Sequence, residues 1–291
     1  MPATTMPSNR QKAVRVTAFG LLVVCAISAS ACDSHSGPQQ VDPAAFSWNA
    51  PVSAPQTVYL RNTNGSVEVK PATDGNVKVT ATVKWRRGDP KKDLKFETAH
   101  DAGGVTVCAI WGEGSCGAGS YKTTSSKLSD KILDHGTDAE VDFIVYVPTG
   151  VKVDAFTVNG SIGVASTAPV FARTANGSIK VATSVGPVDA ETINGEVDVR
   201  MTTLSGDGPV RAHTVNGSAA AYLPEKFDGM VDISSVLGGL TSDFAGLVKK
   251  GEDKDLSGTV GTGGRKVEVG TVTGSAALHK LNADGTVAAP K

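Results

Sequence analysis

This sequence has no excess of basic charge, little leucine and no catalytic signature. Its 291 residues carry a net charge of -1, which leaves no basic field to hold nucleic acid and excludes a charge-driven nucleic-acid partner. Leu occurs 14 times against 37 for Val, and Gly occurs 33 times, a bias away from helix formers and toward strands and turns. The composition therefore predicts an all-β chain.

The sequence also lacks the usual marks of an enzyme. It has neither a His-Glu-x-x-His nor a Gly-x-Ser-x-Gly pattern, and its five histidines are scattered. Gly112–Gly117 matches Gly-x-Gly-x-x-Gly, but no helix is predicted after it to meet a pyrophosphate. We therefore expect no catalytic residues, no metal and no cofactor.

The N-terminal segment predicts export. Basic residues between positions 10 and 15 precede the apolar run 16–27, which is too short to span a membrane, and residues 1–31 are typical of a signal peptide. The string Ala29–Cys32 resembles a bacterial lipobox, in which the cysteine is lipidated. This predicts lipid attachment at Cys32 and a membrane-anchored protein; the alternative is an ordinary signal peptide with Cys32 as a bystander.

The next segment and the remaining cysteines fit an exported protein. Residues 32–55 are rich in Ser, Pro, Gln and Ala without a repeating apolar pattern, which predicts a flexible tether. Cys108 and Cys116 lie in a Gly-rich stretch, and an oxidising compartment favours a disulfide between them. A zinc site would need two further ligands, and a redox pair is normally spaced Cys-x-x-Cys.

An internal repeat is the strongest signal in the chain. The pattern Thr-x-Asn-Gly-x-apolar-x-apolar occurs four times, and its central Asn steps by 17, 18 and 22 residues. Weaker copies begin at Ser235 and Thr271, and an early copy begins at Thr63. The corner residues of the four clear copies are Asn159, Asn176, Asn194 and Asn216, followed by Gly160, Gly177, Gly195 and Gly217.

Two arrangements compete for this repeat. Asn-Gly between strands is a strong hairpin signal, which would give an antiparallel meander. A solenoid instead stacks each residue on its equivalent one coil away, so a column must keep its type, as the repeated Thr and apolar positions do. We therefore predict a β-solenoid in which each Asn takes a left-handed corner geometry and the Asn side chains form an amide ladder.

The repeat also sets the predicted domain limits. Residues 56–281 form a single body, in which the less regular, β-rich part 56–153 caps the regular repeats 154–281. Residues 282–291 are read as a tail. A short helix is predicted only near Ser129–Leu133.

Four carboxylates offer the best alternative to a purely structural surface. They alternate along neighbouring predicted strands and are expected to share one outer face: Asp189, Glu191, Glu196 and Asp198. Such a face is typical of β-helical polysaccharide lyases and glycosidases, and it also suits a Ca²⁺ site. A solvated strand face explains the same residues more simply.

The recurrent Thr-x-Asn-Gly-Ser-Ile-x-Val units and the strand end Val147–Val151 resemble the adhesin-type bacterial proteins of the DUF4097 family, over Val58–Leu278. The resemblance implies a right-handed parallel β-helix, an envelope role and no catalytic residues. We therefore expect a non-enzymatic cell-envelope lipoprotein that acts as an adhesin or interaction scaffold. Expected partners are the membrane through the N-terminal lipid, an envelope glycan or surface protein, and a second copy of the chain; the alternative is a carbohydrate-active enzyme.

Overall fold

Strands make up most of the chain that the computed structural model describes, residues 38–117, 119–123, 138–250, 254–282 and 284–287. These residues form 23 strands and one four-residue helix, α1 (Pro90–Asp93). No helix among them is long and apolar enough to cross a membrane. Ser36–Lys291 forms one compact unit, and the all-β prediction is confirmed.

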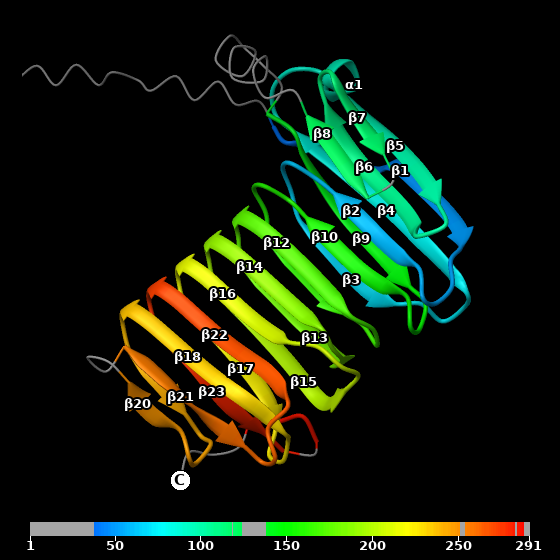
Figure 1. The fold of residues 1–291 in the computed structure, drawn as a ribbon. Helices are drawn as coiled ribbons and strands as arrows, with labels where there is room; N and C mark the ends of the chain where they lie inside the picture. The colour runs from blue at the N-terminus through cyan, green and yellow to red at the C-terminus, as the bar shows by residue number, and fades with distance from the viewer. Residues whose placement is uncertain (1–37, 118, 124–137, 251–253, 283, 288–291) are drawn as a thin grey trace, which may run out of the picture. The chain divides into compact units, whose positions relative to one another are not determined.

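Two long sheets make up the body (Figure 1). Sheet A contains, in spatial order, β1 (Gln40–Pro51), β4 (Asn76–Trp85), β9 (Glu140–Val147), β3 (Val67–Pro71), β11 (Ile162–Ala165), β13 (Ile179–Val185), β15 (Val197–Ser205), β17 (Ala219–Pro224), β23 (Ala276–Leu281) and β19 (Leu240–Ser242). Sheet B contains β20 (Val248–Lys250), β21 (Asp255–Val260), β18 (Gly229–Leu237), β22 (Arg265–Thr273), β16 (Val210–Asn216), β14 (Val188–Asn194), β12 (Val170–Asn176), β10 (Lys152–Phe156), β2 (Thr57–Arg61), β6 (Gly104–Trp111) and β5 (Leu94–Asp101). A separate hairpin joins β7 (Gly114–Gly117) to β8 (Ser120–Thr123).

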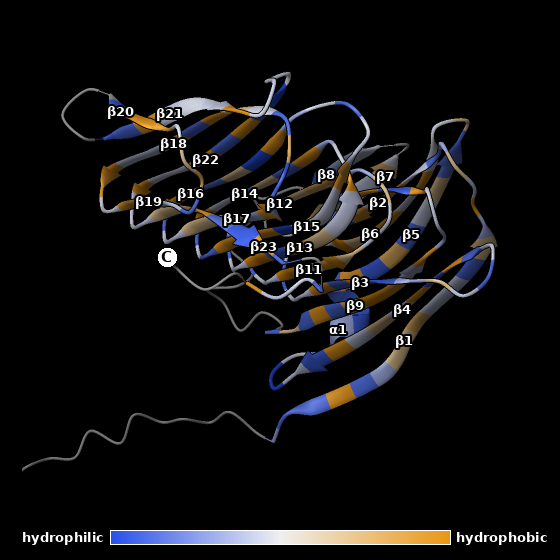
Figure 2. Cartoon of the chain, turned by 90° about the horizontal axis from the view of Figure 1, so that it is seen from below, coloured by the Kyte–Doolittle hydropathy of each residue, from blue (hydrophilic) through white to orange (hydrophobic). Residues whose placement is uncertain are grey.

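Each coil contributes one strand to sheet B and one to sheet A, and equivalent strands of stacked coils pair in parallel. Figure 2 shows hydrophobic and hydrophilic residues alternating along these strands, as expected for strands with one buried face. A single column of buried valines runs through sheet B: Val105, Val58, Val153, Val170, Val188, Val210, Val267 and Val231. The prediction of a parallel β-solenoid is therefore confirmed, and the antiparallel meander is not what the chain forms.

The threonine of each repeat satisfies a carbonyl in the neighbouring coil. Thr192 is buried, and its Oγ1 donates a hydrogen bond of 2.9 Å to the carbonyl oxygen of Gly177. The same bond recurs at other coils, from Thr157 to Gly65, Thr174 to Gly160, Thr214 to Gly195, Thr271 to Gly217 and Ser235 to Gly274. Because a buried carbonyl without a donor is costly, this column explains why the repeat keeps a hydroxyl at its first position.

Replacing Thr192 with valine tests this column. The change keeps the shape of the side chain but leaves the Gly177 carbonyl without its hydroxyl donor. We expect Thr192→Val to lower the free energy of unfolding by about 1 to 2 kcal/mol, measured by urea denaturation. Thr192→Ser keeps the hydroxyl, as Ser235 does naturally, and should cost less; an equal loss in both variants would contradict the role of the hydroxyl.

Antiparallel strands extend sheet B at both ends and sheet A at one end, whereas the other end of sheet A is the parallel strand β19. At one end β4 and β1 extend sheet A beyond β9, and β5 extends sheet B beyond β6. At the other end β21 and β20 extend sheet B beyond β18. These strands cover parallel edges that would otherwise be open to pairing with another chain. Of the strands at the first end, β4 and β5 lie within residues 56–153 and β1 precedes them.

The coils are not stacked in the order of the sequence. The coil β22–β23 lies between β16–β17 and β18–β19, although β18 precedes β22 along the chain (Figure 1). At the other end β2 pairs with both β6 and β10, so the early copy at Thr63 lies directly beside the first regular repeat. Both ends of the stack are therefore built from coils that are distant in sequence.

The predicted tether, helix and tail differ in their outcomes. The tether prediction for 32–55 is wrong at Gln40–Pro51, because this segment forms β1 and packs Phe46 and Trp48 against the core. The helix predicted near Ser129–Leu133 lies outside the described residues. The start of the expected tail forms a turn, in which the amide of Asn282 donates to the carbonyl oxygen of Thr286.

Candidate functional site

The two corners of each coil differ in a way that bears on function. The Asn-Gly corner has a constant length: the step from the Thr column to the first buried residue of sheet A is five residues in every repeat, as from Thr192 to Val197. We call this the constant corner. The opposite corner, where a strand of sheet A leads to the next strand of sheet B, varies in length and is called the variable corner.

The predicted Asn residues line the constant corner as an exposed amide ladder. Nδ2 of Asn176 donates to Oδ1 of Asn159 at 2.8 Å, Asn194 donates to Asn176 at 2.8 Å, and Asn216 donates to Asn194 at 2.9 Å. The expected left-handed geometry falls on the following glycines instead, with φ of +143° to +159° at Gly160, Gly177, Gly195 and Gly217. The expectation for Asn is wrong because Asn176, Asn194 and Asn216 are the last residues of extended strands.

The variable corner takes up all the irregularity of the repeat. The step between the buried columns of sheets A and B is 8 residues from Ile162 to Val170 and 9 from Ile179 to Val188. It rises to 13 residues from Val197 to Val210. The longer 22-residue repeat therefore places its extra residues at this corner, partly in the longer strand β15 and partly in the β15–β16 loop.

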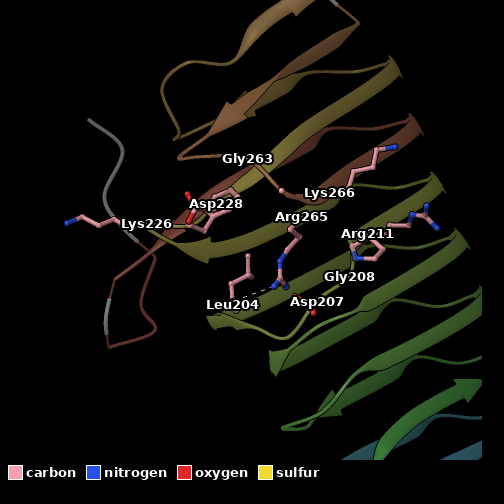
Figure 3. A pocket seen from close by; sticks show the side chains of 12 residues that line it. Leu204, Asp207, Gly208, Arg211, Lys226, Asp228, Gly263, Arg265 and Lys266 are labelled. Carbon is pink, nitrogen blue, oxygen red and sulfur yellow. Dashed lines mark hydrogen bonds between the residues drawn. The ribbon is translucent and has the colours of Figure 1, made fainter.

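An open polar hollow of about 860 Å³ lies beside that loop (Figure 3). Three connections line it: the β15–β16 loop with Asp207 and Gly208, the β17–β18 loop with Lys226 and Asp228, and the β21–β22 loop that leads into Arg265. Two variable corners and one connection between two strands of sheet B thus contribute to one site. Neither a repeat motif nor any residue singled out in the sequence marks it; the 22-residue step was its sole sequence signal.

Arg265 holds one wall of the hollow in place. Its Nη2 donates to the carbonyl oxygens of Leu204 and Gly206, and Figure 3 shows the guanidinium reaching toward the β15–β16 loop. Its Nη1 is buried without a hydrogen-bond partner and lies against Gly186. Arg265 therefore holds the β15–β16 loop in place, because its guanidinium donates to backbone carbonyl oxygens there.

The four carboxylates predicted to share a face do not do so. Asp189 and Glu191 lie on β14 of sheet B, Asp198 lies on β15 of sheet A, and Glu196 lies at the constant corner between them. The two sheets form different sides of the solenoid, so the predicted common face is wrong. Alternation along each strand does not reveal that the constant corner places β14 and β15 in different sheets.

Asp189 and Glu191 are held by an arginine of the neighbouring coil. Arg173 donates from Nη2 to Asp189 at 3.0 Å and from Nε to Glu191 at 3.2 Å. Burial raises the pKa of Asp189 above its ordinary value, repulsion from Glu191 adds to the rise, and Arg173 and Arg211 offset part of it. The cluster links coils across sheet B and leaves no pair of carboxylates open to a substrate.

Asp142 and Asp189 should affect stability at neutral pH in opposite directions. Burial alone would raise the pKa of Asp142, but hydrogen bonds from Lys84 and Ser66 lower it overall, so its charge stabilises the fold above pH 4 and this contribution is lost as pH falls. A raised pKa means that ionised Asp189 costs stability at neutral pH. We expect Asp142→Asn to lower the free energy of unfolding at pH 7 by about 1 kcal/mol, a difference that shrinks as the pH falls below the ordinary range of an aspartate pKa.

Asp189→Asn should leave stability at pH 7 unchanged or raise it, and it serves as the matched control. Urea denaturation of both variants between pH 3 and pH 7 measures the difference. A loss of equal size in the two variants at pH 7 would show that the pKa directions are wrong.

The structure describes two of the three cysteines predicted as sites, Cys108 and Cys116. Cys32 lies outside the described residues. Cys108 and Cys116 are joined by a disulfide, with their Cα atoms 5.9 Å apart. The bond ties the β7–β8 hairpin to β6 of sheet B.

These features define a parallel β-solenoid made of two-strand coils. The family model described as Toastrack DUF4097 matches residues 141–278, a stretch that includes the regular repeats. Among solved structures, the chain is similar to the crystal structure of a "putative cell adhesion protein" from Clostridium sporogenes ATCC 15579, with 11% identity, 82% of this chain and 100% of that chain covered, and a TM-score of 0.44. No curated protein matches.

Proposed function

We propose that the chain is a non-enzymatic lipoprotein of the bacterial cell envelope that binds an envelope glycan at the variable corner. The observation that carries the proposal is the contrast between the two corners. One corner is constant and satisfies its own polar groups through the Asn ladder and the Thr column, whereas the other accumulates loops around an open polar hollow. Binding residues typically lie on loops that a rigid scaffold positions, as these loops are.

The lining of the hollow suits a polar ligand. It combines charged side chains of both signs with glycine backbone, as at Asp207, Lys226, Asp228 and Gly263. Asp228 is fixed by the amide of Thr262, which donates to its Oδ1 at 2.6 Å. Hydroxyl-rich ligands are bound by such mixed donors and acceptors, and an exported, membrane-held protein meets glycans of the envelope.

The binding proposal is tested with the purified chain from Ser36 onward, which includes the whole compact unit. The expected result is binding to isolated envelope polysaccharide in a sedimentation assay, with a clear loss when Asp207 and Lys226 are both changed to alanine. Glu196→Ala at the constant corner is the control and should bind normally. Undiminished binding by the double variant would contradict the proposed location.

The membrane proposal rests on the lipobox-like string that ends at Cys32. In the full-length protein, Cys32→Ser should move the product from the membrane fraction to the soluble fraction and abolish labelling by a fatty acid. Cys25→Ser, a change of the same kind within the apolar run, should have no such effect. Unchanged fractionation and labelling of Cys32→Ser would rule out this anchor.

A further inference from the structure

One position on the outer face of sheet B, Gly270 of β22, has no side chain. Parallel and antiparallel register places the following residues in one outward column: Phe156, Arg173, Glu191, His213, Gly270, Ser234 and Asp255. Gly270 is the one member without a side chain. Its φ needs no glycine, so the absence of a side chain here is not imposed by the backbone.

A second hollow of about 290 Å³ lies at this point. Its lining comes from four adjacent strands: His213 of β16, Glu268 of β22, Asp232 and Ser234 of β18, and Asp255 and Ser257 of β21. His213 and Ser234 lie over Gly270, where a Cβ atom would come within 3.2 Å of both. The hollow is separate from the one at the variable corner.

The hollow presents mainly hydrogen-bond acceptors. Glu268 is already paired, with Arg211 at 2.6 Å and with Lys266 at 2.5 Å. Asp232 and Asp255, by contrast, form no ion pair with any residue in the described part of the chain. Among the described side chains, these two carboxylates thus lie on neighbouring strands without an ion pair to a cation of the protein.

Two polar atoms at the wall are also unpartnered. Nε2 of His213 and Oγ of Ser257 are buried, and neither has a hydrogen-bond partner in the structure. A buried polar group without a partner is costly, so a bound group that supplies hydrogen bonds would be stabilising here. A cation with several N–H donors could bind to these two atoms and to the carboxylates of Asp232 and Asp255.

We propose that this hollow binds a primary ammonium group, such as that of an amino sugar. An ammonium carries three donors and a positive charge, and it can bond to carboxylate, hydroxyl and imidazole acceptors arranged around it. A metal ion needs a tighter set of ligands, and no group of three His, Cys, Asp or Glu side chains in the described residues is arranged to hold one. The proposal is independent of glycan binding at the variable corner.

Titration calorimetry with the chain from Ser36 onward tests the proposal, with glucosamine, N-acetylglucosamine and ethanolamine as probes. Glucosamine should bind, and N-acetylglucosamine, which keeps the ring but loses the charge, should bind at least about tenfold more weakly. If ethanolamine binds as well as glucosamine, the ammonium alone is recognised and a lipid headgroup is an equivalent source. If it binds much more weakly, the sugar ring contributes as well.

Two variants locate the site. Asp232→Asn combined with Asp255→Asn should weaken glucosamine binding at least about tenfold. Asp198→Asn, the same chemical change on β15 of sheet A and outside both hollows, should leave the affinity within about twofold, and thermal unfolding checks that both proteins fold. The proposal fails if glucosamine does not bind, if the acetylated sugar binds equally well, or if the double variant keeps its affinity.

Discussion

Replacing Gly195 with alanine is expected to lower the free energy of unfolding by about 3 to 5 kcal/mol. Gly195 has φ of +150°, which side chains on L-residues rarely adopt, and an added Cβ would lie 2.2 Å from the carbonyl oxygen of Gly177 in the neighbouring coil. The added Cβ and the Gly177 carbonyl oxygen cannot move apart, because both are attached to backbone that hydrogen bonds of the parallel stack hold in place. The strain and the steric clash therefore add.

Gly163→Ala is the matched control for this change. Gly163 lies within β11, and its added Cβ would meet the carboxylate end of the Glu68 side chain, which can rotate away. We expect a change of less than about 0.5 kcal/mol, since alanine also restricts the unfolded chain more than glycine does. Guanidinium denaturation of both proteins measures the difference, and equal effects would show that the corner does not require glycine.

Truncating Ile179 should produce the second large effect. Ile179 is fully buried in sheet A, between Ile162 of one neighbouring coil and Val197 of the other. Changing it to alanine removes three carbon atoms from a closely packed column that cannot collapse without disturbing the register. We expect Ile179→Ala to lower the free energy of unfolding by about 2 to 5 kcal/mol, measured by urea denaturation.

The same substitution at Ile193 provides the control. Ile193 lies at the constant corner between Thr192 and Asn194 and is 50% exposed. Its side chain belongs to an aliphatic column with Val158, Ala175, Val215 and Val272, in which Val158 and Ala175 are half-buried and the others are exposed. Ile193→Ala should change stability by no more than about 0.5 kcal/mol, and a loss close to that of Ile179→Ala would mean that the column is covered.

The interior columns could be predicted from the repeat because stacked coils make identical demands on equivalent residues. Val188 and Thr192 each touch their counterparts in the coils on either side, so their type is fixed by contacts one repeat away. The amide ladder was predictable for the same reason. The left-handed geometry was assigned to Asn instead of Gly because both residues favour such corners, and the position of the strand end decided between them.

The stacking order of the coils could not be predicted from these columns. Thr214, Thr271 and Ser235 carry equivalent hydroxyls, so any of the three coils could stack on another. β22 takes the place beside β16, where Glu268 pairs with Arg211 at 2.6 Å. β18 lies on the far side of β22, and its other edge pairs with the antiparallel strand β21.

The sequence by itself determined the all-β class, the parallel stack and the disulfide between Cys108 and Cys116, because these depend on residue type at regular or short spacing. The tertiary structure alone decided the order of the coils, the place of β1 and the positions of both hollows. It also separated Asp189 from Asp198 onto different sheets. Those features arise from contacts between segments far apart in the chain, for which the repeat carries no distinguishing signal.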